Sequence, residues 1–178
     1  MRYTAAPMTE RARIQHDFDC TEATFWDLFL DDAYNQALFQ GFLKFPRWQV
    51  LERVERNSEL HRVVEVEPYV GELPGPIKKI VGDSFSYREV GYLDRQKQRY
   101  FVKVVPSRLA DKFSVECEQY TEPLDGGKRC RRIFVANVGV HIFGVGGLIE
   151  KRIIADLSKS YDVGAQFTND YVKKHGLS

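Results

Sequence analysis

The sequence lacks the features that define several large classes of protein. No apolar run approaches the length of a membrane-spanning helix, and the first residues, MRYTAAPMTERARIQ, contain no stretch typical of a signal peptide. The 26 basic and 25 acidic residues leave a formal net charge of +1, without the excess of Lys and Arg that marks a nucleic-acid binder. We therefore expect a soluble, cytoplasmic protein that binds no nucleic acid.

Cysteine and histidine are few and scattered. The three cysteines, Cys20, Cys117 and Cys130, form no CxxC pair and are odd in number, which argues against a disulfide framework and favours a reducing compartment. None of the 4 histidines has the spacing of a metal ligand relative to another His or to a Cys. Cys117 has no obvious His partner, so a place in the core is favoured over a nucleophilic role. We predict no metal site and no cofactor.

The length of the chain suits a single domain. A chain of 178 residues can bury a core large enough to need no disulfide or metal, and no internal repeat or low-complexity segment interrupts it. We predict a flexible N-terminal tail over residues 1–10 and one domain over residues 11–178.

The spacing of apolar residues changes along the chain between a strand period and a helix period. Strict alternation predicts antiparallel strands, and apolar residues at every third or fourth position predict helices. Thr21 offers an N-cap for a first short helix, and Gly41 a C-cap for a second. The expected order is a strand over 11–18, two short helices over 22–29 and 32–40, strands over 47–57, 59–66, 84–93, 98–105, 112–124 and 128–140, and a long helix over 147–174.

The last two strands allow a prediction of register. Asp125-Gly126-Gly127 between them is a strong hairpin signal. Placing Leu124 opposite Arg129 brings apolar residues together on one face of the sheet, as the alternation of side chains requires. The expected pairs are Cys117 with Ala136, Val115 with Val138, and Phe113 with Val140.

The segment VGVHIFGVGGLIEKRI, residues 138–153, concentrates four glycines just before the final helix. The glycines match neither GxGxxG nor GxxxxGK[ST], and the strands before them alternate as antiparallel strands do. We therefore interpret residues 144–147 as a joint that lets the last strand turn sharply into the helix, and not as a phosphate-binding loop.

Three stretches carry a resemblance to a known superfamily: FWDLFLDDAYN, LPGPIKKIVGDSFSYRE and IFGVGGLIEK. Together with the order of elements, they resemble the START-like (SRPBCC, helix-grip) superfamily, which includes plant allergen-type carriers, lipid-transfer domains and polyketide cyclases. The chain looks like a bacterial branch of this superfamily and is distantly similar to sterol-binding lipid-transfer domains. The resemblance implies an α+β helix-grip fold, in which a curved seven-stranded antiparallel sheet wraps around a long C-terminal helix. It also implies a cavity for an apolar ligand, and no catalytic residues.

A sheet curved around one amphipathic helix leaves interior space, which either receives an apolar ligand or is filled by the abundant Phe and Tyr side chains. We expect residues on the inner face of the sheet and on the final helix to line this space. The predicted ligand-binding residues are Trp48, Val50, Glu52, Arg62, Val64, Tyr87, Glu89, Tyr100, Phe113, Phe134, Ile149 and Ile153.

Three charged residues of this set, Glu52, Arg62 and Glu89, are expected to project into the concave face. Because buried charges need partners, Arg62 and Glu52 either form a structural ion pair or hold a polar group of the ligand. Glu89, near Tyr100, is the best candidate for acid–base chemistry, since burial raises the pKa of a carboxyl group.

The segment over residues 71–82 interrupts the strands and contains Lys78 and Lys79. It is either a connector whose apolar residues tuck under the sheet or a mobile lid over the cavity mouth. Each lysine contributes only about 1 kcal/mol at an anionic lipid surface, so we expect at most transient membrane contact.

These observations leave three functional hypotheses. The first is a non-catalytic carrier or sensor of a hydrophobic small molecule, such as a lipid, a sterol-like compound or a polyketide. The second is an enzyme of the cyclase or dehydratase type that uses Glu89, Arg62 or Glu52 in the same cavity. The third is a protein-interaction module with a filled core. The sequence does not predict the oligomeric state.

Overall fold

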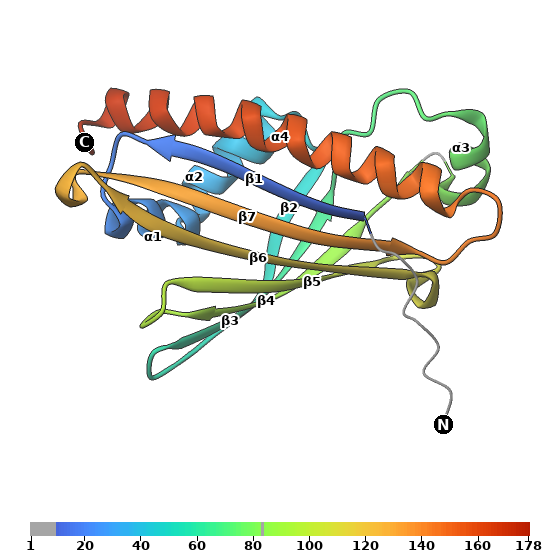
Figure 1. The fold of residues 1–178 in the computed structure, drawn as a ribbon, viewed down its shortest axis with the longest axis horizontal. Coiled ribbons are helices and arrows are strands. Elements are labelled where there is room, and N and C mark those ends of the chain that lie inside the picture. The colour runs from blue at the N-terminus through green and yellow to red at the C-terminus, as the bar shows by residue number, and fades with distance from the viewer. Residues whose placement is uncertain (1–9, 83) are drawn as a thin grey trace.

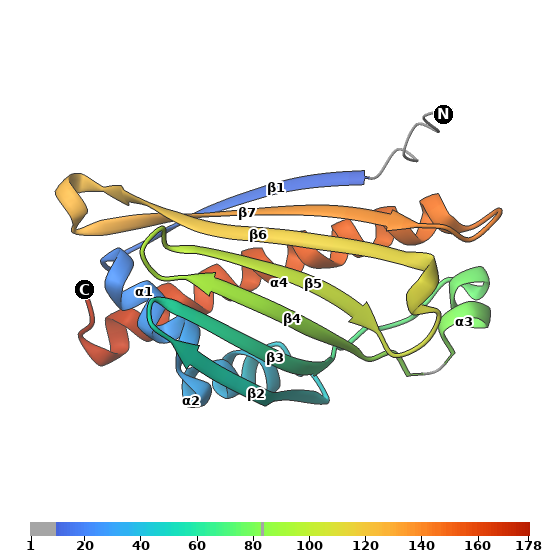
Figure 2. The same ribbon diagram turned by 90° about the horizontal axis from the view of Figure 1, so that it is seen from below.

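Seven antiparallel strands form one curved sheet in the computed structural model, which describes residues 10–82 and 84–178. The order of strands across the sheet is β1-β7-β6-β5-β4-β3-β2 (Figures 1 and 2). The strands are β1 (Glu10–Phe18), β2 (Arg47–Arg56), β3 (Glu59–Glu67), β4 (Tyr87–Asp94), β5 (Arg99–Pro106), β6 (Phe113–Leu124) and β7 (Arg129–Val140). The expected N-terminal tail lies outside the described residues, apart from Glu10, which begins β1.

The longest helix, α4 (Gly146–His175), lies along the concave side of the sheet, nearest to β1 and β7 (Figure 1). Helices α1 (Glu22–Leu30) and α2 (Asp32–Gln36) follow β1, and a π-helical segment, η1 (Ala37–Phe42), leads into β2. Helix α3 (Gly75–Val81) occupies the insertion between β3 and β4. This is the predicted helix-grip fold. No helix in the described part of the chain is long and apolar enough to cross a bilayer.

Of the two helix caps predicted from the sequence, one forms and one does not. The Thr21 side chain accepts a hydrogen bond from the backbone N–H of Thr24 at 3.1 Å and so caps α1. Gly176 follows α4 with a φ of 63°, the left-handed conformation that commonly ends a helix. The second predicted helix does not end at Gly41, because the backbone widens into η1 and carries the helical path to Phe42.

The predicted register of the last hairpin is confirmed. Leu124 lies opposite Arg129, and the three apolar pairs form as expected: Cys117 with Ala136, Val115 with Val138, and Phe113 with Val140. The alternation of side chains therefore places these apolar pairs on the face of β6 and β7 that packs against α4.

The predicted face of β2 is wrong beyond Val50. Val50 pairs with Val64, but the next pair joins Glu52 to Val63, because a β-bulge adds one residue to β2 at this point. One extra residue reverses the direction of every side chain that follows. Glu52 is consequently exposed on the outer face, and Arg53 instead lies opposite Arg62.

The glycine-rich joint before α4 has a steric explanation. A Cβ atom added to Gly146 would collide with the backbone carbonyl oxygen of Val140, so only glycine lets the first turn of α4 approach the end of β7 this closely. Gly144, two residues earlier, has a φ of 79°. The backbone N–H of Val140 donates a hydrogen bond to the Glu150 carboxylate at 2.7 Å and thereby joins the strand to the helix.

Candidate functional site

The interior between the sheet and α4 contains a cavity of about 280 Å³. Its wall is assembled from α1, α2, η1, the inner face of β2 to β7, the segment before α3, and α4. The volume lies just below the lower end of the range for small-molecule sites, roughly 300–1,000 Å³. Three clusters of packed apolar side chains meet around it without filling it.

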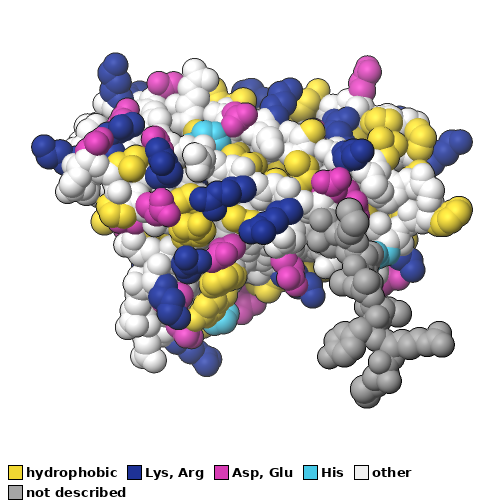
Figure 3. Space-filling view, in the orientation of Figure 1, with side chains coloured by type: hydrophobic (Ala, Val, Ile, Leu, Met, Phe, Trp, Pro, Cys, Tyr) yellow, Lys and Arg dark blue, Asp and Glu magenta, His cyan; other side chains and the backbone are white. Residues whose placement is uncertain are grey.

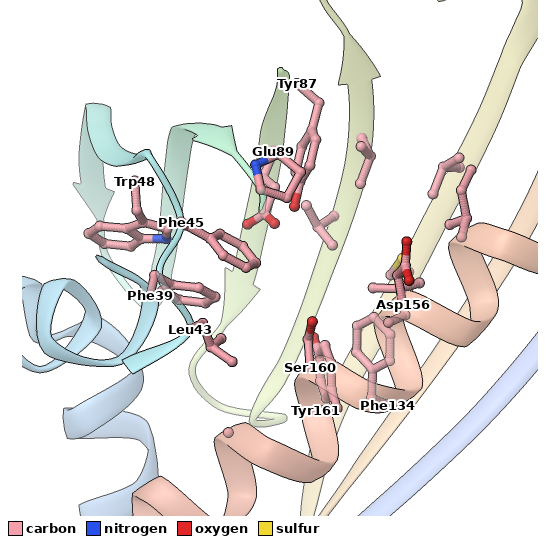
Figure 4. Close-up of a pocket in the computed structure, with 18 of the residues that line it drawn as sticks. Phe39, Leu43, Phe45, Trp48, Tyr87, Glu89, Phe134, Asp156, Ser160 and Tyr161 are labelled. Carbon is pink, nitrogen blue, oxygen red and sulfur yellow. The ribbon is translucent and has the colours of Figure 1, made fainter. Parts of the chain in front are cut away.

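One wall of the cavity consists of aromatic rings from η1, β2 and the connection between them. The rings of Phe39 and Trp48 are stacked, with 5.6 Å between their centroids and 4° between their planes, and Phe45 lies 5.5 Å from Phe39. Figure 4 shows these rings, together with Leu43, facing the interior. Flat, rigid rings present a large apolar contact area at little cost in side-chain entropy.

The opposite wall comes from β7 and α4. Phe134 and Tyr161 pack together with 4.2 Å between their ring centroids, and Ser160 and Asp156 lie one turn apart along the inner side of the helix (Figure 4). Asp156 forms an ion pair with Arg152 at 2.7 Å. Because this wall is carried by a helix and a strand that pack directly on each other, its side chains are held in fixed positions.

We call the part of the cavity wall formed by the inner face of the sheet its floor. Arg62, on β3, is the most buried charged side chain there, with only 3% of its surface exposed. Its Nη1 donates a hydrogen bond to the backbone oxygen of Phe29 at 3.1 Å. The guanidinium carbon also lies 4.5 Å from the ring centroid of Phe29 and 5.4 Å from that of Tyr100. Arg62 therefore fastens the end of α1 to the sheet while facing the cavity.

Glu89, on β4, is the acidic residue beside Arg62. It keeps some accessible surface because it borders the cavity, but it lies deep enough for burial to raise the pKa of its carboxyl group, which the nearby positive charge of Arg62 only partly opposes. No described residue donates a hydrogen bond to this carboxylate. Figure 4 shows its side chain pointing into the cavity between Tyr87 and the ring of Phe45.

Arg132, on β7, brings a second buried guanidinium to the cavity. Its Nη2 lies 2.8 Å from Nδ1 of His16, and Nε2 of His16 lies 2.8 Å from the Asp162 carboxylate. The guanidinium carbon sits 4.5 Å from the ring centroid of Tyr161. Burial lowers the pKa of Arg132, the direction expected for a cation removed from water without a directly bound anion.

Most of the predicted ligand-binding residues line the cavity: Trp48, Arg62, Tyr87, Glu89, Tyr100, Phe113, Phe134, Ile149 and Ile153. Val50 and Val64 do not line it; they pack in the apolar cluster around Trp48. Glu52 lies on the outer face of the sheet, so the ion pair considered between Glu52 and Arg62 does not form.

The lining also contains residues that were not predicted from the sequence: the polar Gln119 and Arg132 at the floor, and the apolar residues of η1. Gln119 is two positions from Cys117, and Arg132 is two positions from Phe134, so the alternation that placed Cys117 and Phe134 also contained the signal for these residues. The wall formed by η1 had no such signal, because it depends on how a helical segment docks on the sheet.

No group of three or more His, Cys, Asp or Glu side chains within the described ranges is arranged to hold a metal ion. The three cysteines are buried and free of disulfides. Burial raises the pKa of the Cys117 thiol to about 12, so this cavity-lining cysteine is a neutral thiol near pH 7.

Comparison with known proteins gives a family and a fold. Residues 13–172 match the family model described as "Protein of unknown function (DUF2505)". None of the curated proteins matches the chain in sequence.

Among solved structures, the Zhui aromatase/cyclase from Streptomyces sp. R1128 is 11% identical, with a TM-score of 0.67 over 93% of this chain and 94% of that one. A START superfamily protein from Mycobacterium smegmatis is 15% identical, with a TM-score of 0.57 over 92% and 97% of the two chains. Norcoclaurine synthase from Thalictrum flavum is 14% identical, with a TM-score of 0.58 over 96% of each. At these identities the likeness establishes the START-like fold and nothing about the ligand.

Proposed function

Since the chain belongs to the DUF2505 family of proteins of unknown function, we propose its function from its cavity: it binds a hydrophobic small molecule between the sheet and α4 without transforming it. Candidate ligands are lipids, sterol-like compounds and polyketides. The observation that carries the proposal is the cavity of about 280 Å³ beside the stacked rings of Phe39 and Trp48. A filled interior, as expected of a pure interaction module, is not favoured by this volume.

Apolar burial supplies the affinity in this proposal. A ligand that removes about 200 Å² of apolar surface from water, similar to one aromatic side chain, gains about 5 kcal/mol before ordering costs are subtracted. The rings of Phe39, Phe45 and Trp48 are already packed against one another, so little side-chain freedom is lost on binding.

Transformation of the ligand is a second candidate function, favoured by one observation. Glu89 places a carboxyl group inside the cavity, near Arg62 and Tyr100. The raised pKa of this carboxyl group suits it to proton transfer. Glu52 has no part in this candidate, because it lies on the outer face. The neutral thiol of Cys117 also makes nucleophilic catalysis by this residue unfavourable. Glu89→Gln distinguishes the two candidates: a carrier keeps its affinity, whereas an enzyme loses turnover.

The proposal includes no nucleic-acid partner and only transient membrane contact through residues 71–82. On the face shown in Figure 3, basic and acidic side chains are interspersed rather than gathered into a patch of one sign. Lys79, on α3, is exposed and available for contact with anionic head groups.

Native mass spectrometry of freshly purified protein tests the proposal directly, because a co-purified ligand adds a discrete mass. Binding is then measured with the neutral dye Nile red. Val102→Trp narrows the cavity from β5, and Ser160→Phe narrows it from α4, so both are expected to reduce dye affinity at least tenfold. Val90→Trp, on the exposed outer face of β4, is the matched control. Unchanged binding in both folded cavity variants would overturn the proposal.

A further inference from the structure

The cavity floor contains four buried side-chain atoms that have no hydrogen-bond partner among the described residues. They are Arg62 Nε, Tyr100 Oη, Gln119 Nε2 and Arg132 Nε. All four residues line the cavity, and the most exposed of them, Arg132, has only 8% of its surface accessible. Folded proteins rarely leave such atoms unpaired, because the cost of removing them from water is not recovered. The four residues border one space, so a ligand group in that space, met by small rotations of these side chains, is the candidate for a shared partner.

Three of these residues are immediate neighbours, and we call Arg62, Tyr100 and Gln119 the donor cluster. Tyr100 pairs directly with Gln119 across β5 and β6. Its ring extends the other way over Gly91, the residue that faces Arg62 across β3 and β4. The guanidinium carbon of Arg62 lies 5.4 Å from the centroid of that ring. The three side chains therefore border one stretch of the floor.

The chemistry of the donor cluster specifies the partner. Arg62 Nε and Gln119 Nε2 carry hydrogens and can only donate, and the Tyr100 hydroxyl can donate as well. A ligand group that satisfies all three must therefore offer several acceptor lone pairs at one place. A carboxylate offers two oxygens with about four such positions, whereas a single hydroxyl offers two.

The charges around the cavity favour an anion. The lining residues include three arginines, Arg62, Arg132 and Arg152, and two acids, Glu89 and Asp156. Arg152 and Asp156 neutralise each other at 2.7 Å. Arg132 is linked through His16 to Asp162, so Glu89 is the lining acid that is left for Arg62. Burial raises the pKa of Glu89 and so favours its neutral form, which leaves the charge of Arg62 without a full partner charge. A buried guanidinium is stabilised by an anion that also accepts its hydrogen bonds.

We infer that the ligand is an amphipathic carboxylate, whose carboxylate group accepts hydrogen bonds from Arg62, Tyr100 and Gln119 while its apolar body lies against the rings of Phe39 and Trp48. This inference rests on the proposed function and narrows it to one class of ligand. It also assigns Gln119 a part in recognition.

Decanoate and 1-decanol test the inference, because they share one chain and differ in the head group. Each is titrated against the protein that holds Nile red, and displacement gives its affinity. We expect decanoate to bind at least tenfold more tightly than decanol. Gln119→Leu and Arg62→Met each remove one donor, so each is expected to weaken decanoate more than decanol and to reduce this preference at least fivefold.

Arg53→Met is the matched control. Arg53 lies opposite Arg62, and its Nη1 donates to the backbone oxygen of Leu30 at 3.0 Å, so it also holds the end of α1 but does not line the cavity. The Arg53→Met variant should prefer decanoate over decanol as strongly as the unmodified protein does. Gln119→Leu keeps the test decisive if Arg62→Met does not fold. Equal affinity for decanoate and decanol would overturn the inference alone, with water satisfying the donors. Failure of both ligands to displace the dye would also overturn the inference, whereas failure of Nile red itself to bind would overturn the proposed function and the inference with it.

Discussion

Tyr100 lies across Gly91, so that a Cβ atom at position 91 would collide with the tyrosine hydroxyl group. The two residues occupy neighbouring strands, and the absence of a side chain on β4 is what allows the ring to lie over it. The ring packs edge-on against Phe29 of α1, with 4.9 Å between the centroids. Gly91 thus sets the position of Tyr100 and, through it, the shape of the cavity floor.

Gly91→Ala is expected to displace the Tyr100 ring and to destabilise the protein by about 1–3 kcal/mol, the usual cost of forcing extra volume into a packed interior. Thermal unfolding measures this cost. In a Tyr100→Leu background the same substitution should cost much less, because the colliding group is gone. Gly147→Ala is the control, since a Cβ atom at position 147 meets nothing within 4 Å. If Gly91→Ala lowers stability equally with Tyr100 and with Leu at position 100, the loss does not come from a collision with the Tyr100 ring.

Glu89 should make the stability of the protein depend on pH. Burial raises its pKa above the usual 4.5, so the folded state binds this proton more tightly than the unfolded state. The contribution of Glu89 to stability is then lost as the pH rises from the usual value through the raised one. Glu89→Gln, which resembles the neutral acid, is expected to be more stable than the unmodified protein at pH 7.5. The difference should shrink toward pH 4.

The matched control for this experiment is Glu52→Gln, which changes an exposed carboxyl on the outer face and should leave the unfolding midpoint unchanged at every pH. If Glu89→Gln instead lowers stability across the whole range, the attraction between Glu89 and Arg62 outweighs the cost of burying the carboxylate.

Regular strands made much of the fold and part of the site predictable from sequence. The alternation in β6 and β7 defined their register, and the register placed Phe113 and Phe134 on the inner face, where both line the cavity. Period-two patterns report a side chain's direction reliably wherever the strand keeps its pleat.

The remainder depended on local departures from regularity. The bulge in β2 turned Glu52 outward, and nothing in the alternation up to Val54 marks where the extra residue enters. The partner of a buried charge was therefore misassigned: Arg62 faces Glu89 and the end of α1, and not Glu52. The aromatic wall at Phe39 arises from a π-helical segment whose docking is set by packing with Trp48, a tertiary relationship that local sequence does not encode.

Cys117 should be unreactive in the folded protein. Its pKa of about 12 leaves roughly one thiol in ten thousand ionised at pH 8, and only the thiolate reacts with iodoacetamide. We expect alkylation of Cys117 at pH 8 to be at least a hundredfold slower in the native protein than in 6 M urea. Peptide mass spectrometry measures the two rates. Native labelling as fast as that of the unfolded chain would show an ionised, accessible thiol and would reopen nucleophilic chemistry at this position.

Arg152 should control how fast a ligand leaves the cavity. From α4 it donates hydrogen bonds to the backbone oxygens of Val70 at 2.9 Å and Glu72 at 3.4 Å. These bonds hold the segment that leads into α3, which lies near the N-terminal end of α4 (Figure 1). Leu73 of this segment and Ile77 of α3 line the cavity. In Arg152→Met the segment loses these two hydrogen bonds to α4, so it should open more often.

We expect Nile red to dissociate from Arg152→Met about five- to tenfold faster in stopped-flow experiments, as loss of roughly 1–1.4 kcal/mol of hydrogen bonding at a partly exposed site would produce. Lys151→Met, one position away on the exposed side of α4, should leave the rate unchanged. Association should accelerate with dissociation, because both pass through the open state, and the equilibrium affinity should therefore change less than either rate. If the dissociation rate is unchanged, the ligand leaves through another part of the cavity wall. If dissociation is faster and the affinity falls in proportion, Arg152 contacts the ligand itself.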